Sequence, residues 1–305
     1  MSFISFWFAS IPVSALPLLL ACLGLILSER SGVVNLGAEG YMAVGAMSGA
    51  SVTLLTGSPW LGVGAGVLAG CCLGLLFAFS VAVLKADQIL SGLAVMAIGL
   101  GLSGFIGRHW VHQPFNGMNA PDLPGLQQLP LLGGLLFKQP LLAWVSILLV
   151  IVIAWILHRT RIGLRFTAVG EDPAAADNAG ISVPGVQMLA GMLCGALCGL
   201  GGAYLSVASA HIWVDNMVAG RGWIALALVV FARWRPGRAL IGALLFGAVD
   251  MLLPRLQAQG FQVPVYLMGM LPYLLTILVL VLATRSRYRD EPAALGVTYL
   301  RQDRH

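Results

Sequence analysis

Long apolar segments recur along the whole chain and leave little polar sequence between them. Of the 305 residues, 59% are apolar and only 10% are charged, whereas soluble domains carry about 25% charged residues. A soluble core of this size has no room for so much apolar surface, so we expect lipid to be the solvent. A membrane-crossing helix needs about 20 mostly apolar residues. On that rule the sequence predicts an all-α membrane protein of about nine spans (eight to ten), at 11–28, 38–56, 60–84, 88–107, 141–158, 184–208, 221–233, 238–254 and 264–283.

The basic residues predict how these spans are oriented. Cytoplasmic loops of membrane proteins carry an excess of Lys and Arg. With nine spans and an internal C-terminus, 13 of the 17 Lys and Arg fall in cytoplasmic segments. The four on the outside are Arg108, Lys138, Arg221 and Arg255. The reverse orientation would invert this ratio, so we expect an inner-membrane protein with its N-terminus outside and its C-terminus in the cytoplasm.

The domain organisation follows from the same segments. We expect one transmembrane domain over residues 1–290, with its largest internal loop at 159–183, and a cytoplasmic tail over 291–305. The aromatic-rich residues 1–10 are expected to lie along the membrane interface. The proline-rich loop 109–140 resists regular structure, and an external partner could use a loop of this length.

Glycines repeat every four residues in two of the predicted helices. The rows are Gly62, Gly66, Gly70 and Gly74 in one, and Gly191, Gly195 and Gly199 in the other. This spacing places each row along one flank of a helix, where another helix backbone can approach closely. We expect packing seams inside the protein, although some of these glycines could face a second copy or a related subunit.

The motifs of enzymes and nucleotide-binding proteins are absent from the sequence. No GxxxxGK[ST] phosphate loop occurs, and the only lysines, Lys85 and Lys138, lie near none. Paired acids, HExxH and GxSxG are also absent. We expect no enzyme activity, no metal and no cofactor bound by this chain. The net charge of +5 comes mostly from residues between apolar segments and does not indicate nucleic-acid binding.

The internal loop contains a short helix with a recognisable signal at each end. Asp172 is a good N-cap, because its carboxylate can accept a hydrogen bond from a free backbone N–H. Pro173 suits the first helical position, and the run 174–176 consists of alanines, the best helix formers. Gly180 can take the left-handed conformation that ends a helix. A two-turn helix is marginal in water, so it must rest on the protein's own surface or on a motor subunit.

Several motifs in order along the chain resemble one known family. They are SERSGVVNLGAEGYM (28–42), KADQILSG (85–92), the internal loop, GRGWIALA (220–227), WRP (234–236), LPYLLT (271–276), and PAALG (292–296) with Tyr299. With them the chain resembles bacterial ABC importer permeases for nucleosides and simple sugars, within the branched-chain amino acid and ribose permease superfamily. Arg233 and Trp234 depart from the pattern, because a glycine-containing sequence is expected there.

The resemblance implies a set of partners and one docking element. Residues 170–181 would form the coupling helix that docks an ABC ATPase subunit. Its candidate docking residues are Gly170, Glu171, Asp172, Pro173, Ala175, Ala176 and Gly180. The ATPase, and not this chain, would use ATP and Mg. Further implied partners are a second permease subunit, different or identical, and a periplasmic or lipid-anchored solute-binding protein.

Polar residues inside the predicted spans are the candidates for a solute pathway, because ionisable groups are costly there. Asn35 and Glu39 share a helical face beside glycines that permit a broken helix. Ser91, Arg221 and Asp250 are further candidates. Structural alternatives remain, since Glu39 could cap its own helix and Arg221 and Asp250 could pair. A neutral polar solute fits so few ionisable groups, while an ion-gradient-driven carrier is the alternative, with Glu39 and Asp250 as its coupling acids.

Overall fold

The computed structural model describes residues 3–121, 135, 137–259 and 290–299, together with the isolated positions 270, 274, 276–278 and 281. These residues form helices and no β-strand; a single isolated bridge joins Val111 to Trp213. The α-helices are α1 (Phe3–Arg30), α2 (Ala38–Thr56), α3 (Pro59–Ala82), α4 (Gln88–Gly107), α5 (Leu141–Arg159), α6 (Arg161–Glu171), α7 (Pro173–Asn178), α8 (Val183–Ala203), α9 (Arg221–Ala232) and α10 (Pro236–Ala258). A short 3₁₀ turn, η1 (Arg108–Trp110), follows α4, and a π-helical segment, η4 (Tyr204–Ala210), extends α8.

Six helices in the described part of the chain are long and apolar enough to cross a membrane. They are α1, α3, α4, α5, α8 with its extension, and α10. The all-α, multi-pass expectation is therefore confirmed. Predicted span 38–56 coincides with α2 and span 221–233 with the twelve-residue α9, while span 264–283 lies outside the described residues apart from a few isolated positions. From Phe3 onward, the residues expected along the interface form the first turns of α1.

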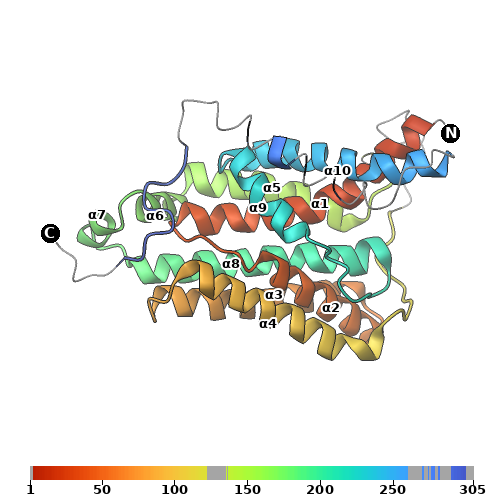
Figure 1. The fold of residues 1–305 in the computed structure, drawn as a ribbon, viewed down its shortest axis with the longest axis horizontal. Helices are drawn as coiled ribbons and strands as arrows, with labels where there is room; N and C mark the ends of the chain where they lie inside the picture. Colours follow the sequence, from red (N-terminus) through yellow and green to blue (C-terminus); the bar gives the residue numbers. More distant parts are fainter. Residues whose placement is uncertain are drawn as a thin grey trace.

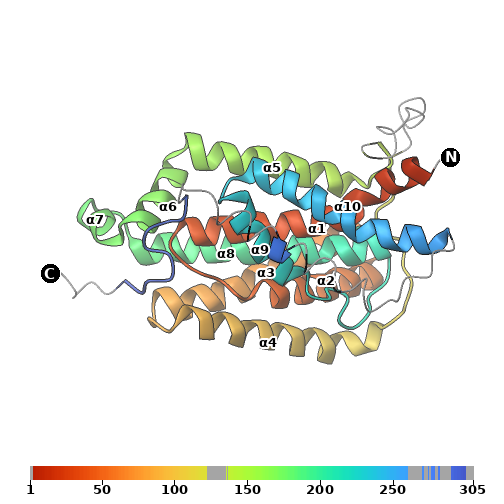
Figure 2. The ribbon, with the colours of Figure 1, turned by 45° about the horizontal axis from the view of Figure 1, so that its top comes forward.

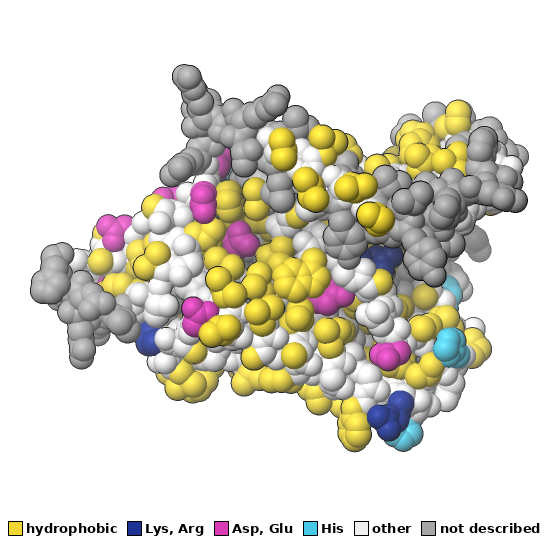
Figure 3. Space-filling model, viewed as in Figure 1, with side chains coloured by type: hydrophobic (Ala, Val, Ile, Leu, Met, Phe, Trp, Pro, Cys, Tyr) yellow, Lys and Arg dark blue, Asp and Glu magenta, His cyan; other side chains and the backbone are white. Residues whose placement is uncertain are grey.

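Helix α1 forms the centre of the bundle, and α4 and α5 lie on its outside. In the most apolar window of α1, 89% of the residues are buried, against 22% in α4 and 28% in α5. Figures 1 and 2 show α1 enclosed by α8, α9 and α10. Figure 3 shows apolar side chains spread over one face of the molecule. Large exposed apolar side chains include Leu68, Phe105, Ile151, Trp155 and Ile241, as expected of a lipid-facing surface.

The two glycine rows face each other, which confirms the predicted packing seam. A Cβ added to Gly70 would lie 2.2 Å from the carbonyl oxygen of Gly195, and one added to Gly74 would lie 2.4 Å from that of Gly191. No side chain fits at these distances, so α3 and α8 approach backbone to backbone. This seam joins the first half of the bundle to the second.

Two non-helical segments interrupt the bundle and precede helices that begin inside it. The first, 31–37, runs from the end of α1 back along α4, where Leu36 packs on Gly92. Helix α2 then begins about halfway along α4, because Gly40 lies against the backbone of Met96. The second segment, 211–220, leads into α9 in the middle of the molecule (Figure 1).

Candidate functional site

The carboxylate of Glu39 joins the two helices that begin inside the bundle. It lies in the first turn of α2 and is only 6% exposed. One carboxylate oxygen accepts a hydrogen bond from the Gly220 N–H at 2.7 Å, and the other accepts from the Gly222 N–H at 2.7 Å. Free N–H groups and the helix dipole make a helix N-terminus favourable for an anion. Glu39 therefore holds the start of α9 against the start of α2.

Asn35 organises the segment that leads into α2. Its side-chain oxygen accepts hydrogen bonds from the Gly37 N–H at 2.9 Å and from the Tyr41 hydroxyl at 3.1 Å. Its amide nitrogen lies 3.6 Å from the Cys194 sulfur, and the residue is fully buried. Irregular backbone at membrane depth is tolerated only where protein or a wet cavity satisfies its polar groups. Asn35 provides that satisfaction, together with Gln88, which accepts from the Val34 N–H at 2.8 Å.

Arg221 and Asp250 form a second polar contact beside α9. An Arg221 guanidinium nitrogen lies 3.9 Å from an Asp250 carboxylate oxygen, and both side chains are partly exposed. The guanidinium also donates to the carbonyl oxygens of Met217 and Val218. Asp250 accepts a hydrogen bond from the Ser14 hydroxyl of α1. This chain of contacts links α1, α9 and α10, as the pairing alternative anticipated.

The structure thus brings together four of the five pathway candidates, in two groups. Asn35 and Glu39 follow one another at the entry to α2, and Arg221 and Asp250 pair beside α9. Ser91 lies apart near the start of α4, half-buried, and its hydroxyl makes no hydrogen bond within the described residues. The sequence analysis missed Ser14, Tyr41 and Gln88 as partners of these groups. Only their polarity within apolar or motif sequence marked them.

A hollow opens one helical turn beyond Glu39. It has a volume of ≈ 250 Å³ and lies between α2, α4 and the segment 211–220. Ala43 of α2 and Ser103 of α4 form one side. The consecutive residues 213–218 form the other side and include the exposed Asp215 and Asn216. The route suggested by polar residues 35–40 is therefore packed shut at those side chains, and accessible space begins next to them.

The short helix predicted in the internal loop is present as α7, at one end of the molecule (Figures 1 and 2). The Asp172 carboxylate accepts a hydrogen bond from the Ala175 N–H at 2.9 Å, Pro173 occupies the first turn, and Gly180 has a φ of +81°. Ala175 is exposed, whereas Ala176 is 3% exposed and faces the protein. Two turns of helix are held by capping and one buried contact, so the outer face of α7 stays open.

The residues that flank α7 are tied to the rest of the protein. Gly170 is buried, and a Cβ added there would lie 2.3 Å from the Arg30 carbonyl oxygen at the end of α1. Glu171 is exposed, and its carboxylate accepts a hydrogen bond from the Ala293 N–H at 3.4 Å. The docking candidates therefore contribute both an exposed surface and its anchoring.

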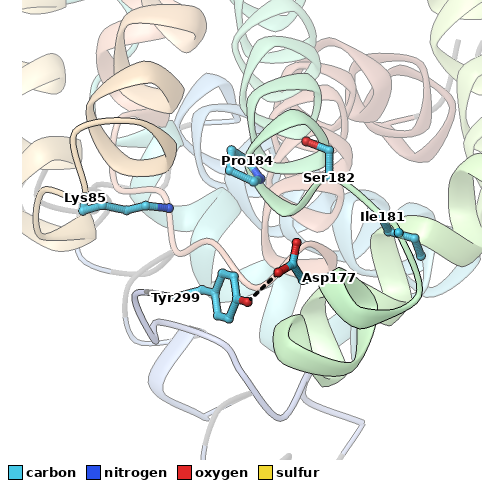
Figure 4. Close-up of a pocket in the computed structure, with 7 residues that line it drawn as sticks. Lys85, Asp177, Ile181, Ser182, Pro184 and Tyr299 are labelled. Carbon is cyan, nitrogen blue, oxygen red and sulfur yellow. Dashed lines mark hydrogen bonds between the residues drawn. The ribbon is translucent and has the colours of Figure 1, made fainter. Parts of the chain in front are cut away.

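The C-terminal segment 290–299 packs on this same end. The Ala294 N–H donates to the Gly170 carbonyl oxygen at 2.9 Å, and the Gly296 N–H donates to that of Gly32 at 3.1 Å. The Tyr299 hydroxyl donates to Asp177 of α7 at 3.1 Å (Figure 4). Residues 290–299 therefore tie α6 and α7 to the segment that leads into α2.

Comparison with known protein families gives one match over most of the chain. Residues 8–280 match the family described as branched-chain amino acid transport system / permease component. The chain belongs to this family. The family resemblance seen in the motifs is thereby confirmed, and the protein is a multi-pass membrane permease.

Individual relatives cover nearly the whole of this permease. It is 41% identical to a putative glucose ABC transporter permease of Haloferax volcanii, with 95% of each chain covered. It is 36% identical to a guanosine ABC transporter permease of Bacillus subtilis, covering 96% of this chain and 95% of the relative. It is 33% identical to a nucleoside ABC transporter permease of Lactococcus lactis, with 96% of each covered. These relatives are permease subunits of ABC transporters, which favours that class over an ion-gradient-driven carrier.

Proposed function

We propose that this permease is the membrane subunit of an ATP-driven importer for nucleosides or a related neutral polar solute such as a simple sugar. The observation that carries the proposal is the near full-length similarity to permeases named for guanosine, nucleosides and glucose. The predicted pathway residues agree, because Glu39 is bonded to backbone N–H groups and Arg221 is paired with Asp250.

The ATPase would dock on α7 and drive alternating access through it. The support is an exposed, capped helix whose neighbours are bonded to the segment that begins α2. ATP and Mg would be bound by that partner, since this chain has no phosphate-loop motif. A second permease chain and an external solute-binding protein would complete the importer. The names of the relatives given above leave open whether the second chain is identical.

Nine spans and a cytoplasmic α7 complete the proposal. The ninth span would be 264–283, which the apolar sequence predicts. The end that carries α7 and residues 290–299 would face the cytoplasm of a bacterial cell, because the basic residues concentrate in its loops. The opposite end, with the N-terminus and residues 108–121, would then face the binding protein.

Transport measurements with the full complex test this function. Vesicles carrying both permease chains and the ATPase should take up labelled guanosine or glucose only with ATP inside and loaded binding protein outside, with ion gradients clamped. Ala175→Arg places a charged, longer side chain on the exposed face of α7, so uptake and solute-stimulated ATP hydrolysis should both be lost. Membrane insertion should stay normal. Uptake that follows an ion gradient without ATP, or full transport by Ala175→Arg, would contradict the proposal.

A further inference from the structure

The segment 211–220 is held in a backbone conformation that its residues do not favour. His211, Asn216 and Ala219 have φ values of +55°, +58° and +51°. Asn tolerates this left-handed region, but for His and Ala such a conformation costs roughly 1–3 kcal/mol and persists only where the surroundings impose it. Immediately before it lies a π-helical segment, η4, and such segments occur frequently at functional sites.

Contacts from both sides impose this conformation. From residues 108–121, which follow α4, the His112 N–H donates to the Trp213 carbonyl oxygen at 3.0 Å and the Phe115 N–H donates to that of His211 at 3.1 Å. At the other end, the Glu39 carboxylate binds the N–H groups of Gly220 and Gly222. A strained loop fixed at both ends presents its middle residues in a defined position, which is what a binding surface requires.

The middle residues border the ≈ 250 Å³ hollow. Asp215 and Asn216 are exposed there, whereas Trp213 is 2% exposed and its indole packs against Gly107 of α4. The Asp215 carboxylate accepts one hydrogen bond, from the Asn216 N–H at 3.1 Å. The Asn216 amide makes none within the described residues. The Asp215 carboxylate and the Asn216 amide can therefore both bind a ligand in the hollow.

These groups suit one class of solute. Carboxylate oxygens accept hydrogen bonds from hydroxyl groups, and an amide both donates and accepts, so adjacent hydroxyls on one ring can be bound together. We propose that this hollow contacts the hydroxyl-bearing ring of the transported solute, the ribose of a nucleoside or a free hexose. The proposal rests on the proposed function and adds the side chains that recognise the solute.

Hydroxyl discrimination in the reconstituted importer tests this site. With binding protein in excess and fully loaded, uptake of guanosine is compared with that of 2′,3′-dideoxyguanosine, and uptake of glucose with that of 2-deoxyglucose. The wild type should prefer the fully hydroxylated probe of the transported class by about tenfold, one hydrogen-bond set. Asn216→Ala and Asp215→Asn should slow that probe about tenfold and bring the ratio near one. Asn119→Ala, an exposed change within residues 108–121, should leave the uptake rates of both probes unchanged.

The outcomes distinguish a failure of the proposed binding site from a failure of the proposed transport function. If the wild type takes up neither guanosine nor glucose with ATP, the proposed function fails. If the wild type transports and both variants keep the rates and the ratio of the wild type, the site is overturned. An equal slowing of both probes, with the ratio preserved, would show that the loop only supports the fold, and this also overturns the site. The pair that shows discrimination identifies the solute class.

Discussion

A single carboxylate determines how two interrupted helices meet. Glu39 lies in the first turn of α2 and accepts the N–H groups that begin α9, so its negative charge faces two helix N-termini at once. Gly222 permits this, because a Cβ there would lie 2.4 Å from the Glu39 nitrogen. The motifs at 28–42 and 220–227 are therefore two halves of one contact.

Removing the charge of Glu39 should destabilise this contact. In Glu39→Gln, one acceptor oxygen becomes an amide donor that faces a backbone N–H, and a buried N–H is left without a partner. We expect a loss of about 2 kcal/mol in the free energy of unfolding and slower uptake. Thermal unfolding in detergent and uptake rates measure both. Ser58→Ala is the control, because Ser58 is half-buried just before α3 and its hydroxyl makes no hydrogen bond within the described residues. Wild-type melting and uptake in Glu39→Gln would show that this contact contributes little.

Arg233 and Trp234 show what a departure from a family motif means in the structure. Both have left-handed backbone conformations, with φ of +52° and +53°, which explains why glycine is expected there. Their side chains stabilise the unfavourable turn. The Trp234 indole N–H donates to Glu29 at 2.6 Å, and Arg233 lies 3.8 Å from Asp290. The sequence indicated the departure, but the compensating partners lie far away along the chain.

At the scale of elements, the C-terminal segment has the least expected position. The sequence predicted a cytoplasmic tail from residue 291, whereas residues 290–299 bind α7, α6 and the segment after α1. Several of these contacts use backbone groups, and backbone groups leave no pattern in the sequence. Tyr299 was noted only as part of a motif. Its hydroxyl bond to Asp177 gives that motif a physical reason.

Removing the contact between Tyr299 and Asp177 should weaken the coupling between ATP hydrolysis and transport without affecting assembly. Tyr299→Phe removes only the hydroxyl that donates to Asp177, a net loss of about 1 kcal/mol. We expect α7 to be less firmly placed, so that solute-stimulated ATP hydrolysis and uptake fall together while basal hydrolysis and membrane insertion persist. Lys138→Ala, an exposed change in the loop 109–140, should leave all four measurements at wild-type values. Wild-type levels of solute-stimulated ATP hydrolysis in Tyr299→Phe would show that the contact with Asp177 is not needed for coupling.

The helical type of the structure was more predictable than the depth at which each helix begins. Apolar length alone located the crossing helices, and glycine spacing predicted the α3–α8 seam. Neither indicates where along the membrane a helix starts, so the entry of α2 and α9 inside the bundle was not predicted beyond a possible break near Asn35. Polarity identified Glu39, Arg221 and Asp250 as important residues. The partners of Glu39 and Asp250 could not be predicted, because they lie far away along the chain. Gly220 is 181 residues from Glu39, and Ser14 is 236 residues from Asp250.

For the whole molecule, the two ends differ in their loops, and this predicts the orientation. The end with α7 also carries the α3–α4 turn and residues 290–299. The α3–α4 turn carries Lys85, and the neighbouring α5–α6 and α9–α10 turns carry Arg159, Arg161, Arg233 and Arg235. The opposite end carries the N-terminus and residues 108–121 (Figure 1). Because basic loops remain in the cytoplasm, the α7 end should be internal.

Cysteine labelling in intact cells tests this orientation. In a Cys72→Ser background, which removes the exposed native thiol, Asn116→Cys and Ala174→Cys each add one exposed thiol, at opposite ends of the molecule. The permease is expressed without its ATPase, so that α7 is uncovered. A membrane-impermeant maleimide should label Asn116→Cys in intact cells and Ala174→Cys only after permeabilisation. Labelling of Ala174→Cys in intact cells, with protection of Asn116→Cys, would mean that the basic end faces outward and that α7 cannot meet a cytoplasmic ATPase.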